Sequence, residues 1–225
     1  MPLIATIASA SARAFGALVS SGPSGQDIYT TPGSYSWTCP VGVTSIAVLV
    51  IGAGSGYEGL AGAGGGGGGL AYKNNITVIP GNTYSLVVGR GGLANENLGQ
   101  PNGAYGTGSS FNGSAVTAGG GTGGWSVFNG STYDSTNGTG GAFSGDGGSA
   151  GQNGSGENAG GSGVYSGSPS FGNGSYLFGG TVNGTATGSR FGASQASGQN
   201  GQNGAVRIIY PGALRSFPST RTGNF

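Results

Sequence analysis

The sequence predicts a mostly β fold: a short N-terminal helix, a small antiparallel β-sandwich-like module, and a glycine-rich region with polyglycine-II-type helices and long loops. Three observations lead to this prediction. Glycine supplies 56 of the 225 residues, and glycine at this density disfavours helical packing. Apolar, β-branched runs bounded by Gly or Pro occur near both ends of the chain. Glycine also recurs at every third position in two stretches, which is the period of an extended polyproline-II-like helix.

Residues 1–22 are expected to form an amphipathic helix. Ile4, Ile7, Phe15 and Leu18 fall near one face at helical spacing. A helix of this length is marginal alone and needs a partner to cover its apolar side, so we expect it to attach or oligomerise the chain. The alternatives are a frayed terminus and a signal-like leader, although no Lys or Arg precedes the apolar run.

Residues 23–33 contain Pro, Gly and Ser and are expected to form a linker. A β-rich module should follow over residues 34–92 plus 204–212. Pro80-Gly81-Asn82 is a turn sequence, which predicts a hairpin between the strands on its two sides. Cys39 is expected to be a small buried residue on a strand. The predicted strands span residues 34–39, 45–51, 70–79, 83–88 and 205–210.

Residues 93–203 are expected to form a glycine-rich region of loops and polyglycine-II-type helices. Such helices leave their backbone groups unpaired internally, so glycine on an inward edge lets neighbouring segments approach and pair them. The period of three is clearest in residues 145–163 and 198–204. The hexaglycine block, residues 64–69, fits either this packing or a loop between strands. Glycine-rich β-loops and disorder are the alternatives for the region as a whole.

Composition argues against several function classes. Charged residues make up 6% of the chain and the net charge is +1, which argues against nucleic acid or an anionic membrane as partner. No apolar run reaches the length needed for membrane insertion. Histidine is absent, and a Gly-x-Gly-x-x-Gly pattern at residues 54–59 lacks the helix and the acidic residue that nucleotide binding requires. The six carboxylates are isolated in sequence. We therefore expect a protein that is not an enzyme and uses no cofactor or metal.

Aromatic islands within the glycine-rich region are the candidate receptor-binding residues. Aromatic side chains among Ser, Gly and Asn are typical of recognition loops, and aromatic faces also suit sugar rings. The alternative is that these residues flank the glycine segments as their hydrophobic contacts. The candidates are Trp125, Phe128, Tyr133, Tyr165, Phe171, Tyr176 and Phe178.

Three features of the sequence resemble known phage proteins. Residues 35–51, the glycine block and residues 78–89 resemble the glycine-rich domain of bacteriophage tail-fibre and related virion proteins. The ending, residues 204–218, is similar to the C-termini of fibre-like proteins of marine phages. The glycine tracts with aromatic islands are similar in composition to tail-fibre tip adhesins, in which polyglycine-II helices hold receptor-binding loops. Those adhesins end on their loop-bearing domain, whereas this chain continues into a tail, residues 213–225.

The resemblance implies a virion structural protein, most simply a short tail fibre or tip adhesin on the extracellular particle. Its partners would be other virion proteins and a host cell-surface glycan or outer-membrane protein, and a homotrimer is favoured. Two alternatives remain open. One is a capsid decoration or head-fibre protein, and the other, of a different class, is an extracellular ice-binding or cell-wall protein.

Overall fold

The computed structural model describes most of the chain outside its N-terminus and a long segment before its last strand. The described residues are 23–56, 64–93, 104–128, 130, 133–136, 138–151, 153–154, 200–212 and 215–217. The helix expected over residues 1–22, with Ile4, Ile7, Phe15 and Leu18, lies outside them.

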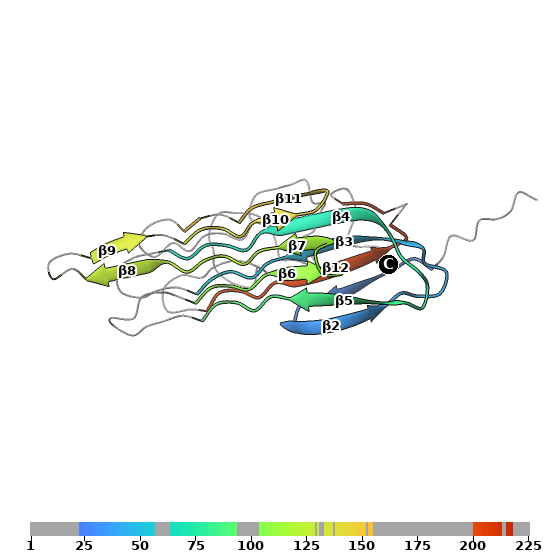
Figure 1. Ribbon diagram of the computed structural model, residues 1–225, viewed down its shortest axis with the longest axis horizontal. Coiled ribbons are helices and arrows are strands. Elements are labelled where there is room, and N and C mark those ends of the chain that lie inside the picture. Colours follow the sequence, from blue (N-terminus) through green and yellow to red (C-terminus); the bar gives the residue numbers. More distant parts are fainter. Residues whose placement is uncertain are drawn as a thin grey trace, which may run out of the picture.

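The described chain is built of antiparallel strands in two five-stranded sheets and one separate hairpin (Figure 1). Sheet A has the order β1 (Gly25–Tyr29), β12 (Ala205–Tyr210), β3 (Ser45–Ile51), β4 (Leu70–Thr77) and β11 (Gly147–Ser149). Sheet B has the order β10 (Phe143–Ser144), β7 (Val116–Ala118), β6 (Ser109–Phe111), β5 (Thr83–Val88) and β2 (Gly33–Thr38). The hairpin pairs β8 (Trp125–Phe128) with β9 (Tyr133–Thr136).

The mostly β prediction is confirmed, but three details of it are wrong. The segment 23–33, expected as a linker, contributes the edge strand β1, which pairs with β12. The glycine-rich region contributes β6, β7, β10 and β11 to the two sheets. Strands β4 and β5 do not form a hairpin, because β4 pairs with β3 and β11 whereas β5 pairs with β2 and β6.

The turn between β4 and β5 carries the chain from sheet A to sheet B. The amide of Gly81 donates to the carbonyl of Cys39 (2.8 Å), and the amide of Cys39 donates to the carbonyl of Asn82 (2.9 Å). Gly81 adopts a φ of 81°, a value that favours glycine. The turn residues were therefore identified correctly, but their backbone bonds fix the turn to the end of β2. A turn sequence alone does not specify which strands will pair on either side.

An inner core fills the space between the two sheets. Every buried member has at most 3% of its surface exposed, and Cys39 is among them as a free thiol. Burial raises the pKa of that thiol, and its Sγ lies 3.3 Å from the carbonyl oxygen of Val43. The buried members are Trp37, Cys39, Val43, Ile46, Val48, Val50, Ala71, Val78, Leu86, Val88, Phe111, Val116, Ala118, Val206 and Ile208.

The opposite face of sheet A is also buried and apolar. Alternate residues of β3 and β12 face this second cluster, which explains why both strands read as nearly continuous apolar runs. Phe217, near the end of the chain, is packed into it. Its buried members are Ala47, Leu49, Ile51, Leu70, Ala205, Ile209 and Phe217.

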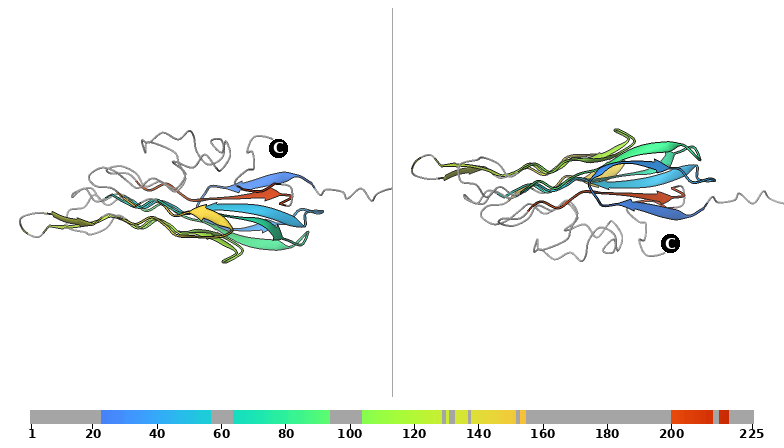
Figure 2. Two further views of the ribbon diagram at one scale, coloured as in Figure 1. Left: turned by 90° about the horizontal axis from the view of Figure 1, so that it is seen from above. Right: turned by 90° about the horizontal axis from the view of Figure 1, so that it is seen from below.

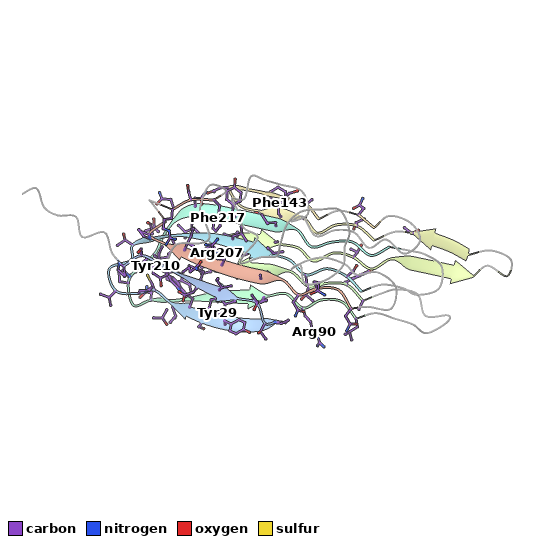
Figure 3. The ribbon with its side chains drawn as sticks, turned by 180° about the vertical axis from the view of Figure 1, so that it is seen from behind. Tyr29, Arg90, Phe143, Arg207, Tyr210 and Phe217 are labelled. Carbon is purple, nitrogen blue, oxygen red and sulfur yellow. The ribbon has the colours of Figure 1, made fainter. Side chains whose placement is uncertain are left out.

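A hydrogen bond between Trp37 and Asp27 links the two sheets at one edge of the sandwich. The indole Nε1 of Trp37 donates to Oδ2 of Asp27 over 2.7 Å, and Trp37 is 3% exposed. Burial and, secondarily, the carboxylate of Asp27 raise the pKa values of Tyr29 and Tyr210. Figure 3 shows these two tyrosines in the same region. Asp27, one of the six carboxylates that are isolated in sequence, is thus a structural acceptor.

Beyond the sandwich, the strands continue as extended glycine-rich segments that pack side by side (Figures 1 and 2). We call this part the glycine bundle. Each segment is continuous with a strand, either following it or leading into it. The segments are residues 52–56, 64–69, 89–93, 104–108, 119–124, 138–142, 150–154 (without 152) and 200–204.

Hydrogen bonding in the glycine bundle follows a period of three residues. Successive amides of one segment point to different neighbours, and amides three residues apart point to the same neighbour. In residues 52–56 the five amides donate, in order, to the carbonyls of Gly69, Thr107, Gln202, Gly66 and Ala104, over 2.9 to 3.1 Å. An extended helix with three residues per turn places its backbone groups in this way. The pairing satisfies donors and acceptors that the segment cannot satisfy internally.

The hexaglycine block lies inside the glycine bundle and is not a free loop between strands. Residues 64–69 are buried, and the amides of Gly66 and Gly69 donate to the carbonyls of Thr122 and Gly119 (both 2.9 Å). A Cβ atom on Gly68 would overlap the carbonyl group of Gly52. Glycine is therefore required here by the close approach of two backbones.

A matched pair of neighbouring residues tests the packing of the bundle. A Cβ on Gly106 would overlap the carbonyl of Ala53, whereas the adjacent Tyr105 is 62% exposed. We expect Gly106→Ala to lower the free energy of unfolding by about 1–3 kcal/mol and Tyr105→Ala to change it by less than about 0.5 kcal/mol. Urea denaturation measures both values, and equal effects would contradict close backbone packing.

The link between the sheets is testable with two substitutions of Asp27. Asp27→Ala leaves the buried indole N–H of Trp37 without its acceptor, so we expect a loss of about 1–3 kcal/mol in the free energy of unfolding. Asp27→Asn retains an acceptor oxygen and should lose clearly less. Thermal or urea unfolding of the two variants gives the comparison. Equal losses would show that the hydrogen bond itself is unimportant.

Candidate functional site

The β8–β9 hairpin lies at the far end of the glycine bundle, away from the sandwich (Figure 1). It contains three candidate receptor-binding residues: Trp125 and Phe128 in β8, and Tyr133 in β9. The register pairs Phe128 with Tyr133 and Trp125 with Thr136. Two of the three aromatics are therefore direct cross-strand partners, next to the connection between the strands. The hairpin places them at the point of the described molecule most distant from the main sheets.

Two bundle segments hold this hairpin, and a pair of threonines joins them. Residues 119–124 lead from β7 into β8, and residues 138–142 lead from β9 into β10. The amide of Thr122 donates to the carbonyl of Thr139 (2.9 Å), and the amide of Thr139 donates to Oγ1 of Thr122 (2.6 Å). The carbonyls of both threonines are in close contact with glycines of neighbouring segments, Gly138 for Thr122 and Gly66 for Thr139, whereas the side chain of Thr139 is exposed. The two segments form one stalk leading to the hairpin.

The other candidate receptor-binding residues lie outside the described part of the chain. They are Tyr165, Phe171, Tyr176 and Phe178. The structure therefore brings together Trp125, Phe128 and Tyr133 on one hairpin and leaves the second expected cluster a prediction. In the sequence, the hairpin was visible only as an aromatic island, because its strands are short and are separated from the sheets by glycine.

The C-terminal tail docks on the outer face of sheet A through Phe217. The side-chain amide of Asn74 makes two bonds with the backbone of Phe217: its Nδ2 donates to the carbonyl (2.8 Å), and its Oδ1 accepts from the amide (2.8 Å). Asn74 lies where the register between β3 and β4 shifts, and the next residue, Asn75, has a φ of 50°. Such a bulge redirects a side chain, here toward the tail.

Phe217 covers a buried arginine. Arg207 is 1% exposed in the middle of β12, and its guanidinium carbon lies 5.7 Å from the centroid of the Phe217 ring (Figure 3). Its Nε donates to Oε1 of Gln26 over 3.0 Å. A cation over an aromatic face is stabilised by the ring quadrupole. Neither Asn74 nor Arg207 was identified from the sequence, since the tail lies 143 positions after its partner Asn74.

No group of three or more His, Cys, Asp or Glu side chains lies together among the described residues. Two of the described carboxylates have structural partners: Asp27 accepts from Trp37, and Asp146 accepts from the backbone amide of Asn74 (2.8 Å). Within the same residues, no helix is long and apolar enough to cross a membrane.

A family model described as a glycine-rich domain matches residues 30–220. The matched range begins after β1 and extends through the sandwich, the glycine bundle, the hairpin and the start of the tail. No curated protein matches the chain.

The docking of the tail is testable by proteolysis. Asn74→Ala removes both hydrogen bonds to the backbone of Phe217. Arg215, two residues before Phe217, is half-buried and donates to the carbonyls of Gly25 and Tyr210 (both 3.3 Å). We expect trypsin to cleave after Arg215 about ten times faster in Asn74→Ala, because cleavage follows the population of the opened segment. Mass spectrometry identifies the product. Asn82→Ala serves as control, because Asn82 is exposed. An unchanged rate of cleavage in Asn74→Ala would show that the bonds between Asn74 and Phe217 do not hold the tail on the sheet.

Proposed function

The chain belongs to the glycine-rich domain family, and on this premise we propose that it is a virion structural protein, a short tail fibre or tip adhesin. In this proposal the β8–β9 hairpin binds a host-surface receptor, either a glycan or an outer-membrane protein. The observation that carries the proposal is the position of an aromatic hairpin at the far end of a long, backbone-paired stalk.

The proposal assigns the glycine bundle to polyglycine-II-type packing. The period of three in its hydrogen bonds and the carbonyl contacts at its glycines support this assignment. Such a bundle separates the hairpin from the sandwich while requiring few side chains. Backbone hydrogen bonds in several directions resist bending better than a single chain does, which suits a module that must hold a binding surface away from a particle.

The chemistry of the hairpin also supports a role in recognition. Its printed sequence sets Trp125, Phe128 and Tyr133 among Ser, Gly, Asn and Thr. Aromatic residues give rigid contact area at low conformational cost, and small polar residues give adaptable hydrogen bonds. The sandwich end then remains for attachment to the particle. Attachment through residues 1–22 and assembly as a homotrimer are part of the same proposal.

Adsorption of particles carrying variant protein tests the proposal. We expect Trp125→Ala combined with Phe128→Ala and Tyr133→Ala to reduce adsorption to host cells at least tenfold, because truncating aromatic anchors removes most of the binding energy at such sites. Val41→Ala is the control, since Val41 is 85% exposed in the turn that follows β2.

Two measurements separate the outcomes. Particle yield and immunogold labelling show whether the variant protein is still assembled and where it lies on the virion. Normal assembly with normal adsorption of the triple variant would reject the hairpin as the receptor-binding site. Labelling over the capsid surface with none on the tail would favour a capsid decoration protein instead.

A further inference from the structure

The outer face of sheet B contains a shallow, open depression at one side of the sandwich. It has a volume of about 580 Å³ and lies over β6, β7 and β10. Small residues at the strand ends create the hollow, because Gly108, Gly119 and Ala142 place little bulk along its rim. Its lining residues are Gly108, Ser109, Ser110, Gly113, Thr117, Ala118, Gly119, Ala142, Phe143 and Ser144.

A row of hydroxyl groups crosses this depression from strand to strand. The register pairs Ser110 with Thr117 and Thr117 with Ser144, so the three lie on adjacent strands about 4.8 Å apart. Ser110 and Thr117 are half-buried and Ser144 is exposed. The neighbouring residues on β6 and β7 are buried on the other face, so the row faces outward.

These hydroxyls are free to bind a ligand. Among the described residues, the side chains of Ser110, Thr117 and Ser144 make no hydrogen bond. Ser109 is different: its hydroxyl donates to the carbonyl of Ile51 (2.6 Å) and accepts from the amide of Gly89 (2.9 Å). The row therefore presents groups that both donate and accept, while the buried hydroxyl next to it is used by the fold.

We infer that this depression is a binding site for a neutral mono- or disaccharide. No Lys, Arg, Asp or Glu is among its lining residues, so it lacks the charged partners that phosphate or carboxylate ligands usually require. Hydroxyl groups complement the hydroxyls of a sugar, and the exposed Ala142 supplies apolar surface beside them. The volume falls within the usual range of small-molecule sites, roughly 300–1,000 Å³.

This site is separate from the hairpin and does not rest on the proposed function. Phe143, which is 42% exposed, lies at the edge of the main sheets (Figure 3), whereas the β8–β9 hairpin lies at the opposite end of the glycine bundle (Figure 1). The molecule would thus have a lateral saccharide site in addition to any receptor contact at its end.

Titration calorimetry of the full chain with lactose, cellobiose, chitobiose and sialyllactose tests the inference. We expect at least one of the three neutral sugars to bind and sialyllactose not to bind more tightly. Thr117→Val removes one hydroxyl with little change in shape and should weaken binding about fivefold or more. Thr38→Val is the matched control, because Thr38 is exposed on β2 in the same sheet and is not a lining residue.

NMR and calorimetry together distinguish binding at the depression from binding at the hairpin. Changes in the NMR chemical shifts of the Ser110, Thr117 and Ser144 amides on addition of the neutral sugar would support a lateral site. The same changes should occur in the variant that carries Trp125→Ala, Phe128→Ala and Tyr133→Ala. Absence of binding by all three neutral sugars would overturn the inference. So would equal weakening by Thr117→Val and Thr38→Val, or loss of sugar binding in the hairpin variant alone, which would assign the saccharide to the hairpin.

Discussion

The part of the molecule beyond the sandwich depends on hydrogen bonds between the backbones of extended segments. A helix with three residues per turn pairs none of its own backbone groups, so each segment is stable only with neighbours close enough to accept and donate. At Gly68 and Gly106, the position of a Cβ atom is already occupied by a carbonyl of the next segment. Glycine here allows two backbones to approach each other closely. The hydrogen bonds that form between them compensate for the backbone entropy that glycine loses on ordering.

The sandwich gives these segments a common origin. Neighbouring strands of each sheet run antiparallel, and the spacing of their ends sets the spacing at which the bundle begins. Sheet A is buried on both faces, by the inner core on one side and by a cluster that includes Phe217 on the other. The tail that supplies Phe217 also covers Arg207, a charge that is costly to bury without favourable contacts. The tail is therefore part of the fold of the sandwich.

Side-chain packing and backbone hydrogen bonds stabilise different parts of the molecule. Apolar side chains are concentrated in the sandwich, and backbone bonds dominate the glycine bundle. Residues that could contact a partner lie where the bundle ends and where a sheet face is open. The β8–β9 hairpin and the outer face of sheet B are two such places, and they differ in chemistry. The hairpin carries aromatic residues, whereas the sheet face carries an uncharged row of hydroxyls.

The sequence by itself determined the local elements: β2, β3, β5 and β12 follow from alternating or β-branched runs, and the period of three indicated close backbone packing. It did not determine the partners. Only the tertiary structure decided that β4 and β5 join different sheets, that residues 64–69 are buried in the bundle, and that Asn74 holds Phe217. Local propensity depends on neighbouring residues, whereas these contacts join segments far apart in the chain. In glycine tracts with no side chains to set a register, the strand with which each segment is continuous positions the segment and so decides which backbones meet.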